Sequence, residues 1–239
     1  MLFLHKPRFF LNDIQSFMNC IAERFNTFKN QLTPGVSLVA VSKTRTLEEI
    51  MQAYESGHRD FGENKVQDLL SRHENLPGDI RWHMIGHLQT NKVKYIISFI
   101  HLIHSVDSEK LLKVINKEAA KAGKITDCLL QIRIAREETK FGLQPQQARE
   151  LAGSGLFEKY PHVRICGLMG MASFTEDTGQ IAEEFSILEQ EYRHYQGHYF
   201  KGRPEFEILS MGMSDDYLLA LSHGSNMLRV GSALFGERS

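Results

Sequence analysis

Short apolar runs alternate along the chain with longer segments in which apolar residues recur every three or four positions. A short, nearly continuous apolar run is typical of a strand buried on both faces, and the wider spacing is typical of an amphipathic helix. Because eight strand candidates alternate with helical segments in a chain of 239 residues, we predict an α/β fold, a (β/α)8 barrel of the TIM type. The expected strands span residues 36–41, 59–62, 81–86, 102–106, 128–134, 163–171, 206–211 and 227–230.

An additional helix is predicted ahead of the first strand. Apolar residues recur at helical spacing between residues 9 and 31, and Pro34-Gly35 ends the segment. We expect this leading helix, within about residues 1–34, to pack over the bottom or side of the barrel. No Pro/Gly-rich linker or low-complexity tract divides the sequence, so residues 1–239 are expected to form a single domain. The apolar positions of the leading helix are Ile14, Phe17, Met18, Ile21, Phe25 and Phe28.

The first expected strand is followed by a lysine. Lys43 comes after the apolar run at 36–41, and Thr46 with Glu49 matches a capping box that begins the next helix. This position is the carboxyl end of a strand, where (β/α) barrels place their chemistry. A buried amine is costly unless it is paired, neutralised or used in a reaction. Lys43 is therefore a candidate nucleophile, and the alternative is an ordinary lysine whose amine reaches solvent.

Two loops at the same end of the predicted barrel are rich in small and hydroxyl residues. They follow the seventh and eighth expected strands, which is where barrels frequently bind phosphate. Their hydroxyls, glycines and backbone amides suit a phosphate group, although plain turns and helix caps have a similar composition. A phosphate held opposite Lys43 favours a phosphorylated carbonyl compound bound as a Schiff base. The two loops contain Ser210, Met211, Gly212, Met213 and Ser214, and Arg229, Val230, Gly231 and Ser232.

Composition limits the classes of function and the cellular compartments that we expect for the protein. The formal net charge is −1, which argues against a nucleic-acid or membrane-surface role. Cys20, Cys128 and Cys166 have no CxxC spacing, so we expect neither a disulfide framework nor a zinc site, and a reducing compartment. The residues from Met1 to Leu4 are too few for a signal-peptide core, and no apolar run reaches about 18 residues. We therefore expect a cytoplasmic protein.

Five motifs resemble those of the pyridoxal-phosphate homeostasis protein family: VAVSK at 39–43, FGEN at 61–64, WHMIGHLQTNK at 82–92, SMGMS at 210–214 and RVG at 229–231. The resemblance extends from about Leu11 to Arg238, and the family looks like the isolated barrel of alanine racemase. It implies that Lys43 carries pyridoxal 5'-phosphate (PLP) as an internal aldimine and that Arg229 faces the pyridine nitrogen. It also implies phosphate contacts from Ser210, Ser214, Gly231 and Ser232. The expected cofactor-binding residues are Lys43, Asn64, Ser210, Met211, Gly212, Ser214, Arg229, Gly231 and Ser232.

An arginine opposite the pyridine nitrogen has a chemical consequence. A guanidinium is a permanent cation at working pH, so it disfavours protonation of that nitrogen. An unprotonated pyridine is a poorer electron sink than a pyridinium, and carbanion chemistry is damped. The alternative role for Arg229 is an ion pair with an acid near the strand end.

Other polar residues leave two interpretations open. Asn64 either contacts the cofactor or caps its helix. His83 and His87 are four residues apart, but Gly86 interrupts the helical face that a zinc pair would need, so we expect one packed and one surface histidine. Lys140 is either a solvated loop residue or a second amine at the mouth that accepts the cofactor.

Three functions fit these residues. Two-base racemisation needs a second acid/base on the face of the cofactor opposite Lys43. In the alanine racemases that the barrel resembles, a tyrosine of an additional β domain has that role, and we expect no such domain because the sequence ends at Ser239. We therefore expect a non-catalytic PLP-binding protein of vitamin B6 homeostasis, which could deliver PLP to apo-enzymes and for which a monomer is plausible. The alternatives are a PLP-dependent amino-acid racemase and a cofactor-free Schiff-base aldolase.

Overall fold

The computed structural model describes residues 21–137 and 140–237. Its strands are all parallel and pair in chain order into a closed barrel, in which β1 also pairs with β8. This confirms the predicted (β/α)8 fold, and each of the eight expected strands is present with ends that differ by a few residues. The strands are β1 Ser37–Val41, β2 Asp60–Glu63, β3 Arg81–Met84, β4 Leu102–Val106, β5 Thr126–Gln131, β6 Val163–Met169, β7 Ile208–Ser210 and β8 Met227–Val230.

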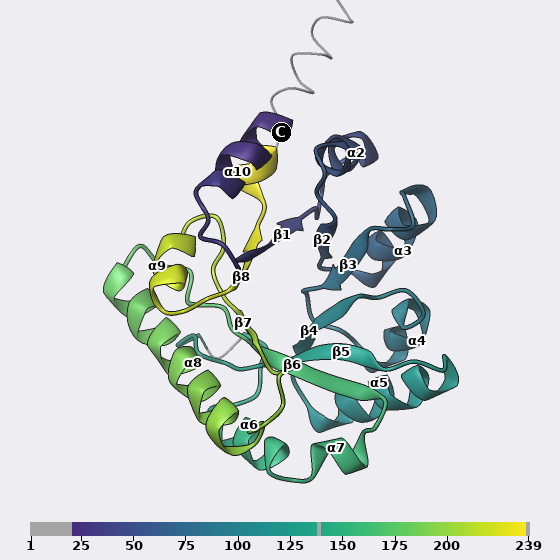
Figure 1. The fold of residues 1–239 in the computed structure, drawn as a ribbon, viewed down its shortest axis with the longest axis vertical. Coiled ribbons are helices and arrows are strands. Elements are labelled where there is room, and N and C mark those ends of the chain that lie inside the picture. Colours follow the sequence, from purple (N-terminus) through teal and green to yellow (C-terminus); the bar gives the residue numbers. More distant parts are fainter. Residues whose placement is uncertain (1–20, 138–139, 238–239) are drawn as a thin grey trace, which may run out of the picture.

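Helices surround the barrel (Figure 1). Two of the helix starts follow from local hydrogen bonding: Thr46 and Glu49 form the capping box of α2, and Ser108 accepts from the Leu111 amide at the start of α5. In the part of the chain that is described, no helix has the length and apolar character needed to cross a membrane. The helices are α2 Leu47–Glu55, α3 Val66–Asn75, the 3-10 turn η1 Thr90–Lys92, α4 Val93–Ile96, α5 Glu109–Lys121, α6 Pro145–Ala152, α7 Leu156–Lys159, α8 Thr178–His198, α9 Tyr217–Ser222 and α10 Ser232–Phe235.

The leading helix is described over residues 21–30, and it lies beside α10 (Figure 1). Phe25 is fully buried and contacts the rings of Phe235 and His58, while Phe28 contacts the ring of Tyr217 in α9. The described part of this segment therefore packs against α9, α10 and His58, which lies just ahead of β2. The predicted positions Ile14, Phe17 and Met18 lie outside the described residues.

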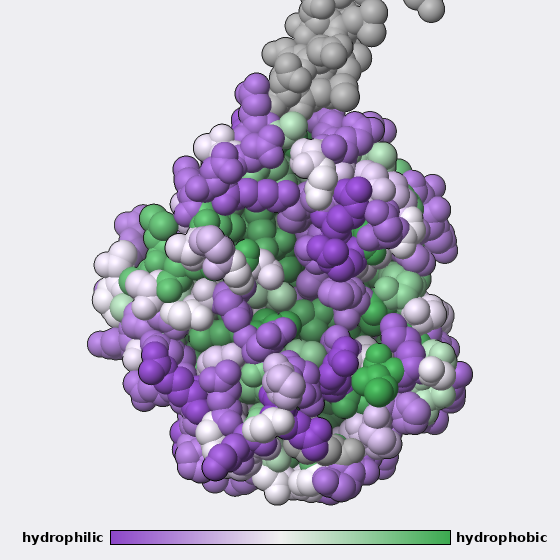
Figure 2. Space-filling model, viewed as in Figure 1, coloured by the Kyte–Doolittle hydropathy of each residue, from purple (hydrophilic) through white to green (hydrophobic). Residues whose placement is uncertain are grey.

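The core has an outer layer between strands and helices and a small layer inside the barrel. Apolar side chains show between polar ones on the face drawn in Figure 2. Inside the barrel the apolar cluster is small, and buried polar side chains are also present, among them His83 of β3, His104 of β4, Ser210 of β7 and Arg229 of β8. Such groups need hydrogen-bond partners within the protein. The apolar cluster consists of Val39, Leu102, Leu129, Cys166, Met169 and Met227.

His58 should make the stability of the fold depend on pH. It packs against Phe25 and Phe61, and burial lowers its pKa to about 4. The folded protein keeps His58 neutral while the unfolded chain takes up a proton near pH 6.5, so stability falls as the pH drops from about 6.5 to 4, by up to about 3 kcal/mol. Chemical denaturation at pH 7 and pH 5 should show a smaller loss in His58→Phe than in wild type. An equal loss in both proteins would contradict this assignment.

Candidate functional site

A cavity of about 190 Å³ opens at the carboxyl ends of β1 and β8. Side chains alternate along a strand, so Val39, Val41 and Lys43 share one face. Val39 belongs to the cluster inside the barrel, and Val41 and Lys43 line the cavity above it. The lining residues are Val41, Lys43, Arg45, Phe174, Met213, Ser214, Asp215, Arg229, Gly231 and Ser232.

The backbone around Lys43 is held in a demanding conformation. Thr44 has a φ of 67°, and it is the one residue other than glycine with a positive φ in the described part of the chain. That conformation costs free energy for a β-branched residue and is found mainly at functional sites. On the other side, the Ser42 amide donates to the Gly62 carbonyl (3.1 Å). Both neighbours of Lys43 thus have restricted backbones, which fixes where its side chain begins.

A buried ion pair lies next to this turn. Glu63 is fully buried at the end of β2, where it accepts a hydrogen bond from the Ser42 hydroxyl and pairs with Arg72 of α3. Arg72 also donates to the Arg45 carbonyl (3.0 Å). Burial raises the pKa of Glu63, and the charge of Arg72 and the hydrogen bond from Ser42 act against that rise. The pair therefore connects the residues on both sides of Lys43 to one helix.

The loops after β7 and β8 meet at Ser214. Its hydroxyl oxygen accepts from the backbone amides of Gly231 (3.3 Å) and Ala233 (3.5 Å). Two backbone donors thus converge on an oxygen at the edge of the cavity, as they would on an oxygen of a bound phosphate. Gly212 supports this arrangement: it has a φ of 96° and its carbonyl accepts from the Arg229 amide (3.0 Å).

Arg229 lies at the inner end of the cavity with 3% of its surface exposed. Its guanidinium donates to Ser210 Oγ (2.6 Å) and to the Gly170 carbonyl (2.9 Å). Both partners are neutral, so the alternative of a direct ion pair with an acid does not describe these contacts. Burial lowers the pKa of Arg229 to about 10, which leaves the side chain a cation at neutral pH.

The structure brings together part of the predicted set. Lys43, Ser214, Arg229, Gly231 and Ser232 all line the cavity. Gly212 and the buried Ser210 and Met211 lie outside its lining, and the Ser210 hydroxyl is directed to Arg229 and His104. Asn64 also lies outside the lining. It does not cap α3, whose cap residue is Lys65, and its Oδ1 is buried without a hydrogen-bond partner among the described residues.

Sequence reasoning missed several lining residues. Arg45, Phe174 and Asp215 contact the cavity from three different loops, and no local pattern marks them. Phe174 is 90% exposed and, with Met213 and Asp215, also lines an adjoining groove of about 500 Å³. Lys140 lines this groove too. Its amine donates to the Ala172 carbonyl (2.6 Å), so Lys140 contacts the loop after β6 and is not simply solvated.

The two histidines of the third motif lie apart. His83 is buried inside the barrel, whereas His87 is exposed and lies 2.9 Å from the Asp107 carboxylate. The expectation of one packed and one surface histidine is confirmed. His83 instead lies near Asp60 and His101, whose ligand atoms are all within 4.8 Å of one another. Asp60 is already paired with Arg81 (2.7 and 2.5 Å), which disfavours a cation there.

Comparison with known proteins identifies the family. The family model of the alanine racemase N-terminal domain matches residues 18–239. A pyridoxal phosphate homeostasis protein of Aquifex aeolicus is 38% identical over 202 residues, covering 84% of this chain and 86% of its own length. One from Schizosaccharomyces pombe is 38% identical over 212 residues, covering 85% of each chain. The chain belongs to the pyridoxal phosphate homeostasis protein family.

Solved structures agree with this family. PipY of Synechococcus elongatus with PLP bound has a TM-score of 0.80 and 33% identity, and the match covers 90% of this chain and 100% of that chain. An alanine racemase of Clostridium difficile has a TM-score of 0.72 at 15% identity, covering 92% of this chain and 57% of the racemase. At 15% identity, the similarity to the alanine racemase shows a shared fold.

Proposed function

We propose that this protein binds PLP as a Schiff base on Lys43 and takes part in PLP homeostasis without robust catalysis of its own. The observation that carries the proposal is one cavity that joins a primary amine, the Ser214 hydroxyl on which two backbone amides converge, and a buried guanidinium. The PLP-bound structure of PipY, a relative of 33% identity, supports the same ligand.

The residues present fit this cofactor. The cavity of about 190 Å³ is smaller than the roughly 300–1,000 Å³ pockets that hold drug-sized ligands, which suits a small aromatic phosphate. The Lys43 amine would condense with the aldehyde carbon and release water. The Gly231 and Ala233 amides, with the hydroxyls of Ser214 and Ser232, would hold the phosphate.

Arg229 determines how reactive the bound cofactor can be. PLP supplies an electron sink for carbanion chemistry. The Arg229 cation is buried and would face the pyridine nitrogen, where it disfavours protonation and weakens that sink. Ser210 does not itself line the cavity, and its hydroxyl oxygen accepts a hydrogen bond from Arg229, so its role is to hold that guanidinium in place. The proposal thus replaces the expected phosphate contact of Ser210 with a supporting one.

The second candidate is an amino-acid racemase, and one experiment separates it from the carrier. A racemase needs a second acid or base besides the Lys43 amine. Among the described residues that line the cavity, Asp215 is the one that offers a carboxylate for this role. We therefore expect that the PLP-loaded protein, incubated with L-alanine, forms no more D-alanine than free PLP does, as measured by chiral chromatography. Rapid racemisation would refute the carrier function.

The phosphate contacts can be tested by comparing PLP with pyridoxal, which lacks the phosphate. In Ser214→Ala the affinity for PLP should fall about tenfold, because a hydrogen bond to a charged group is lost, while the affinity for pyridoxal stays the same. Equilibrium absorbance titration measures both. The matched control is Ser222→Ala, whose hydroxyl is exposed on α9 and contacts the Leu219 carbonyl (2.7 Å). Equal losses for both ligands would contradict the assignment.

The proposal also includes the compartment, the oligomeric state and the partners of the protein. The described cysteines Cys128 and Cys166 are buried and unpaired, which fits a reducing cytoplasm. A single barrel domain, a monomeric state and delivery of PLP to apo-enzymes remain part of the proposal. Size-exclusion chromatography with light scattering measures the oligomeric state.

A further inference from the structure

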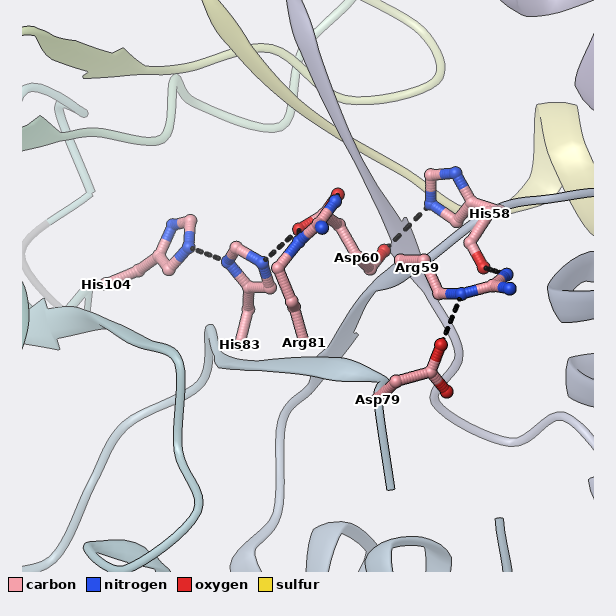
Figure 3. A network of polar contacts seen from close by, with 7 residues as sticks. All are labelled: His58, Arg59, Asp60, Asp79, Arg81, His83 and His104. Carbon is pink, nitrogen blue, oxygen red and sulfur yellow. Dashed lines mark hydrogen bonds and ion pairs between the residues drawn. The ribbon is translucent and has the colours of Figure 1, made fainter. Parts of the chain in front are cut away.

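A chain of hydrogen bonds crosses the interior of the barrel from the cavity to its opposite end. Arg229 Nη1 donates to Ser210 Oγ (2.6 Å), and Ser210 Oγ lies 3.3 Å from His104 Nδ1. His104 Nε2 lies 2.9 Å from His83 Nδ1, and His83 Nε2 lies 3.1 Å from Asp60 Oδ1 (Figure 3). The five side chains come from β8, β7, β4, β3 and β2, so this chain exists only when the barrel is closed.

The positions of the protons follow from matching donors to acceptors. Burial lowers the pKa of His104 well below its ordinary value, so the ring is neutral and carries one N–H. Ser210 Oγ accepts from Arg229, and its own proton finds an acceptor in His104 Nδ1. The His104 proton is then on Nε2 and is donated to His83 Nδ1. Because His83 Nδ1 accepts this hydrogen bond, the His83 proton lies on Nε2 and is donated to Asp60, so every donor in the chain points toward Asp60.

The two ends of the chain carry opposite charges. Asp60 accepts two hydrogen bonds from Arg81 (2.7 and 2.5 Å). Although burial would raise the pKa of Asp60, the hydrogen bonds from Arg81 and His83 hold it below its usual value, so Asp60 is an anion. At the other end Arg229 is a buried cation whose direct partners are neutral. Ser210, His104 and His83, which lie between these two charges, each direct an acceptor atom toward the Arg229 end of the chain. This arrangement stabilises the charge of Arg229.

We propose that Ser210, His104, His83 and Asp60 are positioning residues that orient the Arg229 guanidinium toward the ligand. The inference rests on the proposed function, in which Arg229 faces the pyridine nitrogen of PLP. One of its five N–H groups is directed to Ser210 and another to the Gly170 carbonyl, no further partner is found among the described residues, and Arg229 lines the cavity. The chain thereby sets the electronic environment of the cofactor from the far end of the barrel.

The proton arrangement is tested on the protein without PLP, by nitrogen NMR of isotopically labelled histidine at neutral pH. His104 and His83 should both be neutral with the proton on Nε2. A proton on Nδ1 of His104 would overturn the proposal, because the Ser210 hydroxyl would then lose its acceptor. The NMR measurement does not depend on PLP. If the protein fails to bind PLP, the proposed function fails, and the NMR result still decides whether the hydrogen-bond chain exists.

The effect on the cofactor is tested with His104→Phe, which removes both hydrogen bonds of the ring. The visible absorbance maximum of the PLP-loaded variant should shift, and PLP should bind about tenfold more weakly or worse, since the support of a charged group is lost. The control is Asp79→Asn, because Asp79 lies near the chain but pairs with Arg59 (2.8 Å) and contacts no member of it (Figure 3). An unchanged spectrum and affinity in His104→Phe would overturn the proposal, and should this variant fail to fold, the wild-type NMR result decides.

Discussion

Replacing Lys43 with alanine should abolish covalent attachment of PLP and the yellow colour that accompanies it. Lys43 lies between the restricted backbones of Ser42 and Thr44 and lines the same cavity as Ser214, whose hydroxyl accepts from two backbone amides. A primary amine is the group that condenses with an aldehyde, and alanine offers none. After incubation with PLP and removal of excess ligand, absorbance spectra should show the visible band in wild type and none in the variant.

Two controls make this result specific to Lys43. Lys43→Arg retains the positive charge but has no primary amine, so it should also stay colourless. Lys140→Ala removes an amine that lies in the adjoining groove and contacts the Ala172 carbonyl, and it should keep the band. A full band in Lys43→Ala would show that another amine carries the cofactor.

Replacing Glu63 with alanine should destabilise the fold by about 3–5 kcal/mol, because it leaves the partner of a buried ion pair without its counter-charge. Arg72 has 9% of its side chain exposed and Glu63 none, so bulk solvent screens the remaining charge only weakly. Ser42 loses its hydrogen-bond acceptor in the same change. Denaturant titration should show the loss directly, and the melting temperature should fall by roughly 10 °C.

The matched control for Glu63→Ala is Asp79→Ala. Asp79 pairs with Arg59 at the surface, with 57% of its side chain exposed, and removal of such a pair should cost under about 1 kcal/mol. Similar losses in the two variants would contradict the view that burial makes the Glu63–Arg72 pair important.

The barrel could be predicted from sequence because its signals are local. Most strands are short and largely apolar, such as Leu102–Val106, and the following helices show their own spacing or cap, such as Ser108. The positions of Lys43 and Arg229 at the cavity could be predicted for the same reason. Both are charged residues at strand ends, and the barrel brings these ends to one mouth.

The interior polar chain could not be predicted in this way. His83, His104 and Ser210 are each one residue of a strand, and their contact depends on the register with which the barrel closes. One signal was present: Ile208 and Ser210 share a face of β7, as Met227 and Arg229 share a face of β8. That alternation places Ser210 beside Arg229 inside the barrel, although its loop composition suggested a phosphate contact.

Borohydride reduction of the PLP-loaded wild-type protein, followed by peptide mass spectrometry, tests whether this cavity holds PLP on Lys43. We expect a pyridoxyl phosphate group on the peptide that contains Lys43, in about one equivalent per chain. A reduced protein whose Lys43 peptide is unmodified, with the label elsewhere or absent, would contradict this expectation.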